Sequence, residues 1–136
     1  MSERDQARER HLDTTVNAVV ATVRRDGSIQ LSPNWYLWTG DAILVSTTRA
    51  TAKVHNIRRD PRVTVCIDDP ETGRYVTIAG PAEIIEDDRV PSLTQELVAK
   101  YVVEAEVKPH WERINRNHDR VIIRVEAADV WWRRGY

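Results

Sequence analysis

Apolar positions along the first third of the chain predict three strands joined by tight turns. Residues 15–23 are apolar on both faces, which is typical of a well-buried strand. The Asp26-Gly27 pair readily supplies the positive φ of a hairpin turn, so residues 28–37 are expected to return as a second strand. Pro33 marks an edge or a bulge within it, and residues 42–47 form a third strand.

In the rest of the chain, the spacing of apolar residues is typical of helices in some segments and of strands in others. The predicted helices cover residues 1–13, 50–59 and 90–104, and a further short helix over 109–117 is left open. The predicted strands cover residues 62–67, 74–85 and 120–131. Asp60-Pro61 ends the second helix, because a residue before proline resists the α conformation. The long strand 74–85 is expected to bend or bulge at Gly80-Pro81.

These elements predict a mainly β fold, a small antiparallel β-barrel with six to seven strands. One helix is inserted after strand 3 and another follows later in the chain. A parallel α/β fold is not expected, because most of the predicted strand connections are tight turns, which can join only antiparallel strands. With 136 residues and no linker or repeat, residues 1–136 are expected to form a single domain.

Composition narrows the classes of partner. The formal net charge is only -1, so nucleic-acid binding through bulk charge is not expected. No apolar run is long enough to cross a bilayer, so no membrane partner is expected. The charged N-terminus does not resemble a secretory signal. Cys66 is the single cysteine, which excludes an internal disulfide and fits a reducing compartment. We therefore expect a cytoplasmic protein.

Residues 46–62 carry the clearest chemical signal, because hydroxyls and cations gather where a strand meets a helix N-terminus. The residues of interest are Ser46, Thr47, Thr48, Arg49, Thr51, Lys53, Arg58, Arg59 and Arg62. Such a cluster can receive a phosphate group. The alternative is structural: Thr48 or Thr51 caps the helix, and the arginines form a solvated face. The residues by themselves leave both interpretations open.

Aromatic residues form a second cluster. The segment Ser32-Pro33-Asn34-Trp35-Tyr36-Leu37-Trp38 places Trp35 and Tyr36 on opposite faces of a strand. An aromatic ring on the outer face needs a cover, either a dimer partner or a planar ligand. The Trp131-Trp132 pair on the last strand indicates the same arrangement, with one ring inside and one outside.

The sequence shows no metal-ligand spacing. The four histidines are scattered and no cysteine pair joins them, so a metal site is not expected. Glycine-rich phosphate loops and a nucleophile elbow are absent as well. Any redox chemistry therefore needs a bound organic cofactor.

Several motifs together resemble the pyridoxamine 5′-phosphate oxidase-like, FMN-binding split barrels, over about residues 8–134. The matching segments are Ala18-Val-Val-Ala-Thr-Val, Gln30-Leu-Ser-Pro-Asn-Trp-Tyr, Leu44-Val-Ser-Thr-Thr, Lys53-Val-His-Asn-Ile-Arg-Arg-Asp-Pro-Arg-Val and Tyr75-Val-Thr-Ile-Ala-Gly-Pro-Ala-Glu-Ile. The run that begins at Lys53 is the most specific. It is most similar to the branch that uses the deazaflavin F420 in place of FMN.

The resemblance implies a homodimer with two cofactor sites at the subunit interface. By position, Lys53 would hold the cofactor phosphate and Arg58 an acidic tail. The phosphate and ring approach would be lined by Ser46, Thr47, Thr48, Arg49 and Thr51. The tricyclic ring would lie beside Ser32, Pro33, Asn34 and Trp35, with Tyr75 nearby in the next strand. Some deazaflavin-binding members carry arginine about where Thr51 stands, so the resemblance implies that anion binding here is either weaker or shifted toward Arg49.

The resemblance therefore implies an F420-dependent oxidoreductase that transfers a hydride between the deazaflavin and a small organic substrate. An FMN-dependent oxidase or reductase is the alternative within enzymes, and a flavin- or F420-binding carrier or sensor is the non-catalytic one. A dimeric structural or interaction protein, with the cation-rich helix only as surface, also remains. The chain lacks the Arg-x-x-Pro ending expected of a pyridoxamine phosphate oxidase proper. No catalytic side chain is assigned.

Overall fold

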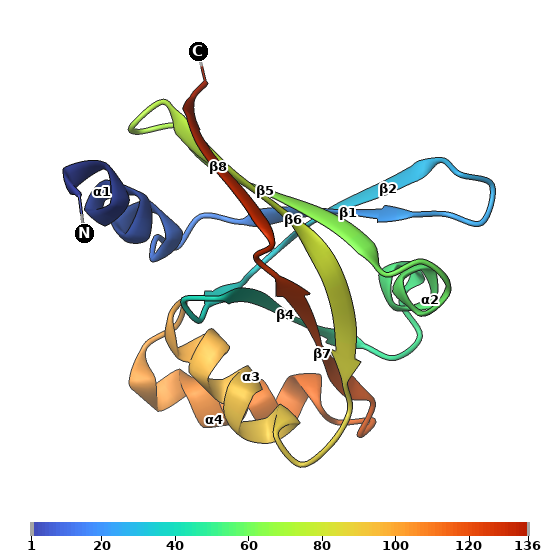
Figure 1. Cartoon of the computed structure of the whole chain (residues 1–136). Coiled ribbons are helices and arrows are strands. Elements are labelled where there is room, and N and C mark those ends of the chain that lie inside the picture. Colours follow the sequence, from blue (N-terminus) through green and yellow to red (C-terminus); the bar gives the residue numbers. More distant parts are fainter. Residues whose placement is uncertain (1, 136) are drawn as a thin grey trace.

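A computed structural model describes residues 2–135 of the chain. Within these residues, eight antiparallel strands form one curled sheet, with four helices around it (Figure 1). The strands are β1 (Ala18–Val23), β2 (Ile29–Asn34), β3 (Leu37–Trp38), β4 (Ala42–Thr48), β5 (Arg62–Asp69), β6 (Arg74–Ile85), β7 (Arg120–Glu126) and β8 (Asp129–Arg134). The helices are α1 (Glu3–Leu12), α2 (Ala52–Arg59), α3 (Val90–Ala99) and α4 (Glu104–Ile114). The predicted mainly β class is confirmed.

The sheet is continuous in the order β2-β1-β5-β6-β7-β4-β3, and β8 pairs with β6 outside this path. Because β6 is long, it can pair with three different strands. Its first part pairs with β5 and β8, and residues 82–85 pair with β7. The change of partner falls at Gly80-Pro81, where the sequence predicts a bend. A Cβ at position 80 would collide with the backbone carbonyl of Glu126, so glycine is required there.

One core fills the inside of the curled sheet. Alternating residues of β5 point inward, and Val63, Val65 and Ile67 are buried as their period predicts. Val54 and Ile57 of α2 are buried as well. A second, smaller cluster lies between the outer face of β4 and β7 and helices α3 and α4, which Figure 1 shows packed against that side of the sheet.

Three predicted elements are divided in the structure. The predicted strand 28–37 is interrupted between β2 and β3, where Tyr36 is completely buried. The predicted strand 120–131 is two strands with different partners, β7 on β4 and β6, and β8 on β6 alone. The predicted helix 90–104 ends at Ala99, and α4 begins at Glu104.

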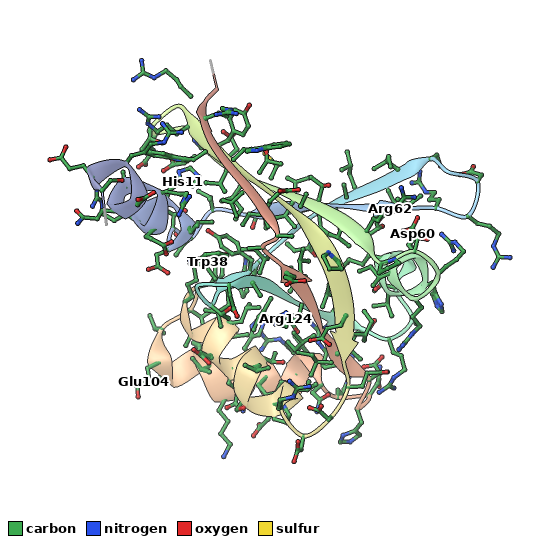
Figure 2. All side chains as sticks on the ribbon, viewed as in Figure 1. His11, Trp38, Asp60, Arg62, Glu104 and Arg124 are labelled. Atoms are coloured by element: carbon green, nitrogen blue, oxygen red, sulfur yellow. The ribbon has the colours of Figure 1, made fainter. Side chains whose placement is uncertain are left out.

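Two local contacts fix the helices to the sheet. Trp38 Nε1 donates a 2.8 Å hydrogen bond to Glu9 Oε2, which ties α1 to β3. Asp60 accepts a 2.7 Å hydrogen bond from Arg62 Nη2 at the junction of α2 and β5. Figure 2 labels Trp38, Asp60 and Arg62, with Asp60 and Arg62 beside α2 and Trp38 near the helical layer.

Candidate functional site

Ser46, Thr48 and Arg120 share the face of the sheet that α3 and α4 cover. Thr48 is paired with Arg120 across the β4–β7 ladder, and Ser46 lies two residues earlier, so all three side chains are on one face. Arg120 Nη2 donates a 2.8 Å hydrogen bond to Ser46 Oγ. Arg120 Nε is buried and has no hydrogen-bond partner within residues 2–135. The pairing of β4 with β7 thus brings one cation and two hydroxyl groups together at one corner of the sheet.

Lys53 adds a second cation to this corner from the first turn of α2. Burial lowers the pKa of Lys53, and the nearby positive charge of Arg120 lowers it further. Burial also lowers the pKa of Arg120. Within residues 2–135 neither side chain forms an ion pair with a carboxylate. Two half-buried like charges without a counter-ion are costly unless they serve to bind an anion.

Thr47 and Thr51 lie behind this corner. Thr47 is only 5% exposed and its hydroxyl donates to Thr51 Oγ1 over 3.2 Å. Thr51 is the N-cap residue of α2, but its side chain makes no capping hydrogen bond. It donates instead to the carbonyl oxygen of Thr48 at 3.1 Å. Thr51 therefore ties the turn between β4 and α2 rather than capping the helix through its side chain.

The arginines of the predicted cluster divide into two groups. Arg49 and Arg58 both bond Glu86 Oε1, at 3.1 and 2.8 Å, on the surface beside α2. Their charges and hydrogen bonds hold the pKa of Glu86 below its usual range. Arg59 donates to the carbonyl oxygen of Val23 and Arg62 bonds Asp60, so these last two stabilise local structure.

A cavity of about 290 Å³ lies between the sheet and helices α3 and α4. It is lined by Asn34, Trp35, Ser46, Leu97, Val98, His110, Ile114 and Arg120. Three of these lining residues, Asn34, Trp35 and Ser46, are among the site residues predicted from the sequence. The cavity therefore joins the aromatic segment to the corner that holds Arg120.

Trp35 forms one wall of this cavity and remains 37% exposed. Its ring stacks on Tyr101, with centroids 4.6 Å apart and planes within 1°. It also stacks on His110 at 5.4 Å and 24°. The Tyr101 hydroxyl donates to the carbonyl oxygen of Val16 at 3.1 Å, which anchors the stack to the barrel. Burial raises the pKa of Tyr101, so the phenol stays neutral.

The other residues predicted to lie beside the cofactor ring do not share one face, because side chains alternate between the two faces of β2. Asn34 Nδ2 donates to the backbone and side-chain oxygens of Ser32, at 2.8 and 3.2 Å, so these two residues form one unit. Pro33 is exposed on the opposite face of β2. In one subunit, therefore, only Ser32 and Asn34 share the side of the strand that leads to the cavity.

Tyr75 is not brought together with Lys53 in one chain. It lies at the β5–β6 turn, paired with Asp68 and Arg133. Figure 1 shows this turn and α2 on opposite sides of the molecule. Pro81, beside the end of α2, lies six positions after Tyr75 along β6, roughly 20 Å at a rise of about 3.3 Å per residue. Within one chain, Tyr75 therefore does not line the corner that holds Lys53 and Arg120.

The outer face of the sheet around β1, β2 and β8 carries exposed apolar side chains. They are Val19, Ile29, Leu31 and Trp131. Trp131 is 54% exposed whereas Trp132 is 8% exposed, so the pair has one ring inside and one outside as predicted. A wider hollow of about 660 Å³ lies on this same face, away from Lys53, with Ala21, Ile29 and Thr64 in its lining.

The described residues form neither a metal site nor a membrane-spanning helix. Within residues 2–135, no group of three or more His, Cys, Asp or Glu side chains is arranged to hold a metal ion. None of the described helices has the length and apolarity needed to cross a membrane.

Sequence reasoning missed Arg120, His110 and Tyr101. Arg120 begins β7, so its place beside Ser46 depends on a strand pairing across more than seventy residues. His110 and Tyr101 reach Trp35 only because α3 and α4 turn back over the sheet. No local motif marks these residues. The only available signal for Arg120 was a cation at the start of a strand otherwise rich in valine and isoleucine.

Comparison with known proteins agrees with this architecture. The profile of the pyridoxamine 5′-phosphate oxidase family matches residues 5–133. A solved F420 reductase is 28% identical, with 90% of this chain and 94% of the other covered and a TM-score of 0.73. A conserved hypothetical protein from Mycobacterium tuberculosis is 27% identical, with 97% and 84% covered and a TM-score of 0.78. A putative pyridoxamine 5′-phosphate oxidase from Listeria innocua, 19% identical over 96% and 98% at a TM-score of 0.69, shares the fold.

Proposed function

The chain belongs to the pyridoxamine 5′-phosphate oxidase family and has its split-barrel fold, and from this premise we propose that it is an F420-dependent oxidoreductase. In this proposal the cofactor phosphate binds at the corner formed by Lys53, Arg120 and Ser46. The deazaflavin ring lies toward Asn34 and Trp35. The protein transfers a hydride between the cofactor and a small organic substrate.

The observation that carries the proposal is the pair of unneutralised cations, Lys53 and Arg120. Lys53 lies near Arg120, and Arg120 lines the polar end of a cavity whose other walls include aromatic and aliphatic side chains. Arg120 Nε is a buried donor without a partner in the described chain, and Ser46 supplies a hydroxyl. A phosphate offers oxygens to all of these donors and neutralises both charges. The residues present therefore fit a cofactor that carries a phosphate next to a planar ring.

The exposed cations favour F420 over FMN. Arg49 and Arg58 lie beyond Lys53 on the surface of α2 and its preceding turn, and together they carry one more positive charge than Glu86 neutralises. FMN ends at its phosphate, whereas F420 continues into an acidic oligoglutamate tail that these arginines suit. The likeness to a solved F420 reductase supports the same choice. FMN remains the second candidate, because Lys53 and Arg120 alone satisfy a single phosphate.

We also propose a homodimer that covers the outer face of the sheet. Val19, Leu31 and Trp131 expose apolar surface there, and a second copy of the chain would bury it. The position of Tyr75 fits this arrangement, because Tyr75 lies away from Lys53 in one chain and the partner subunit would bring it to the cofactor. Sedimentation equilibrium should give twice the chain mass of 15.7 kDa, and a monomer at micromolar concentration would contradict the dimer.

When bound, the reduced deazaflavin supplies a hydride from C5. The side chains of this protein then have three tasks: to neutralise the phosphate, to orient the ring and to exclude water from the reacting face. Leu97, Val98 and Ile114 provide the dry wall for the last task. No side chain is required to pass through a covalent intermediate.

The test of the activity is oxidation of reduced F420 by the purified protein with a panel of enones and quinones. We expect at least one acceptor to be reduced faster than in the absence of protein. A Lys53→Ala variant should lose this rate through weaker cofactor binding. Tight F420 binding with no turnover on any acceptor would instead favour a carrier.

A further inference from the structure

His110 is held in one tautomer by its neighbour on α4. Arg113 Nη2 lies 2.8 Å from His110 Nδ1. A guanidinium has only donors and stays protonated in proteins, so Nδ1 must be the acceptor. The proton of the neutral imidazole then resides on Nε2. Burial, followed by the charges of Arg113 and Arg120, lowers the pKa of His110. The ring is therefore neutral near pH 7 and presents an Nε2–H donor.

This donor has no partner of its own. Within residues 2–135, no hydrogen bond of His110 other than that with Arg113 is found. The ring stacks on Trp35 and lines the cavity between the sheet and α3 and α4. Its position is fixed from two directions, by the stack and by the Arg113 hydrogen bond. A polar group fixed in this way in the lining of a cavity is typical of a group that orients a ligand.

The rest of the cavity defines what can bind there. Leu97, Val98 and Ile114 form an aliphatic wall, and Trp35 adds an aromatic edge. Arg120 and Ser46 lie at the polar end, where the proposed phosphate binds. A planar, uncharged ring fits the apolar part, and its hydrogen-bonding atom toward His110 must be an acceptor. A ring carbonyl oxygen has both properties.

We propose that His110 Nε2–H donates a hydrogen bond to the carbonyl oxygen of a planar ring bound in this cavity. The ring belongs either to the cofactor or to a substrate such as a quinone or a cyclic enone. On a substrate carbonyl this hydrogen bond withdraws electron density from the conjugated system, which favours hydride addition to that ring, whereas on a cofactor carbonyl it holds the ring in place. The assignment to the cofactor ring rests on the proposed function; the assignment to a separate carbonyl compound does not.

The test uses three variants with a graded loss of the donor. His110→Gln keeps an N–H donor, and His110→Phe keeps a flat ring without one. Arg113→Ala leaves the imidazole but releases its tautomer. Glu112→Gln, an exposed change on the same helix, is the matched control. Dissociation constants are measured for FMN, F420 and the quinone menadione, each with the unmodified chain and every variant, and ¹⁵N NMR of the imidazole nitrogens reports the tautomer.

We expect the unmodified protein to show His110 as the Nε2–H tautomer. His110→Phe should weaken binding of a cofactor or of menadione by roughly threefold to tenfold, the usual effect of one neutral hydrogen bond. His110→Gln should recover part of this loss. A loss confined to FMN or F420 assigns the carbonyl to the cofactor, and one confined to menadione assigns it to the substrate.

Two results would overturn the inference. One is an Nδ1–H tautomer in the unmodified protein, and the other is unchanged affinity for all three ligands in His110→Phe. Failure of the proposed function looks different. In that case the unmodified protein binds neither FMN nor F420, and the menadione measurements with the NMR spectrum still decide the role of His110.

Discussion

Arg120 and Ser46 are joined by a 2.8 Å hydrogen bond that crosses from β7 to β4 and fixes the guanidinium at the polar end of the cavity. The charge held there is close enough to Lys53 to lower the pKa of the amine. Two cations from elements distant in sequence are thus kept together although they repel each other. This arrangement has a cost for the ligand-free protein and is useful when an anion binds between them.

Removal of Lys53 should weaken cofactor binding. In Lys53→Ala the loss should be about 1.5–3 kcal/mol, the usual contribution of a hydrogen bond to a charged group. Fluorescence titration measures it, and Lys108→Ala, an exposed lysine on α4, is the control. Equal affinity of Lys53→Ala and the unmodified chain would remove Lys53 from the site.

Replacement of Arg120 should separate binding from stability. Arg120→Met should weaken cofactor binding about as much as Lys53→Ala, whereas the melting temperature of the ligand-free protein should stay equal or rise. The reason is that a half-buried cation without an ion-pair partner is lost. The pKa of Lys53 should rise toward its ordinary value of 10.5, because a like charge is removed. A lower melting temperature with unchanged affinity would show that Arg120 is structural.

Neutralising Glu86 should distinguish the two cofactors. Glu86 occupies both Arg49 and Arg58, so Glu86→Gln frees these cations for an acidic tail. We expect F420 to bind about two- to fivefold more tightly at low salt, as for an exposed ion pair, and FMN to bind unchanged. Glu96→Gln, an exposed change on α3, is the control. An equal gain for FMN would place its phosphate near these arginines.

Gly80 should tolerate no side chain. In Gly80→Ala the new Cβ would meet the carbonyl carbon and oxygen of Glu126, and backbone atoms cannot move aside as a side chain can. The expected destabilisation is about 1–3 kcal/mol, as for other overpacked positions. Urea denaturation measures it. An unchanged midpoint would mean that β6 does not bend at Gly80-Pro81 as described.

Lys100 should make stability depend on pH. Its Nζ donates to the carbonyl oxygen of Tyr36 at 3.1 Å and lies 3.5 Å from the centre of the Tyr36 ring. Burial lowers its pKa from 10.5 to about 8. Above pH 8 the unfolded chain therefore binds more protons at Lys100 than the folded chain, and the free energy of unfolding rises with pH.

The Lys100 effect is best measured between pH 8 and 9.5, because Tyr36 has the opposite effect at higher pH. Burial raises the pKa of Tyr36, so near pH 10 the unfolded chain begins to lose phenol protons that the folded chain keeps. The free energy of unfolding then falls as the pH rises. Urea denaturation of the unmodified protein and of Lys100→Met at pH 7.5 and 9.5 isolates the Lys100 contribution. The unmodified protein should gain stability relative to Lys100→Met over this range. A parallel pH response of the two would contradict a lowered pKa of Lys100.

Local sequence patterns predicted most of the elements because their causes are local. The strand period of β5, the turn at Asp26-Gly27 and the stop at Asp60-Pro61 each depend on a few neighbouring residues. The helix predicted for 90–104 runs past its observed end because Tyr101 and Val102 continue its apolar period. In the structure Tyr101 leaves the helix to bond Tyr36 and Val16, which are remote in sequence.

The site was predicted in part for the same reason. Ser46, Thr48 and Lys53 are close in sequence, so their cluster was visible, and alternation along β4 explains why Thr47 lies on the other side. Arg120 joins them only through the β4–β7 pairing. Trp35 was expected to need a cover from a partner or a ligand, whereas Tyr101 and His110 of the same chain already cover part of it.

The most direct test of the central claim is parallel titration of the purified protein with F420 and FMN, read by cofactor fluorescence, with Lys53→Ala and Arg120→Met beside it. We expect saturable binding of F420, weaker binding of FMN, and a loss of F420 affinity in both variants. Clearly tighter binding of FMN would contradict the choice of cofactor. No saturable binding of either cofactor would contradict the cofactor site itself.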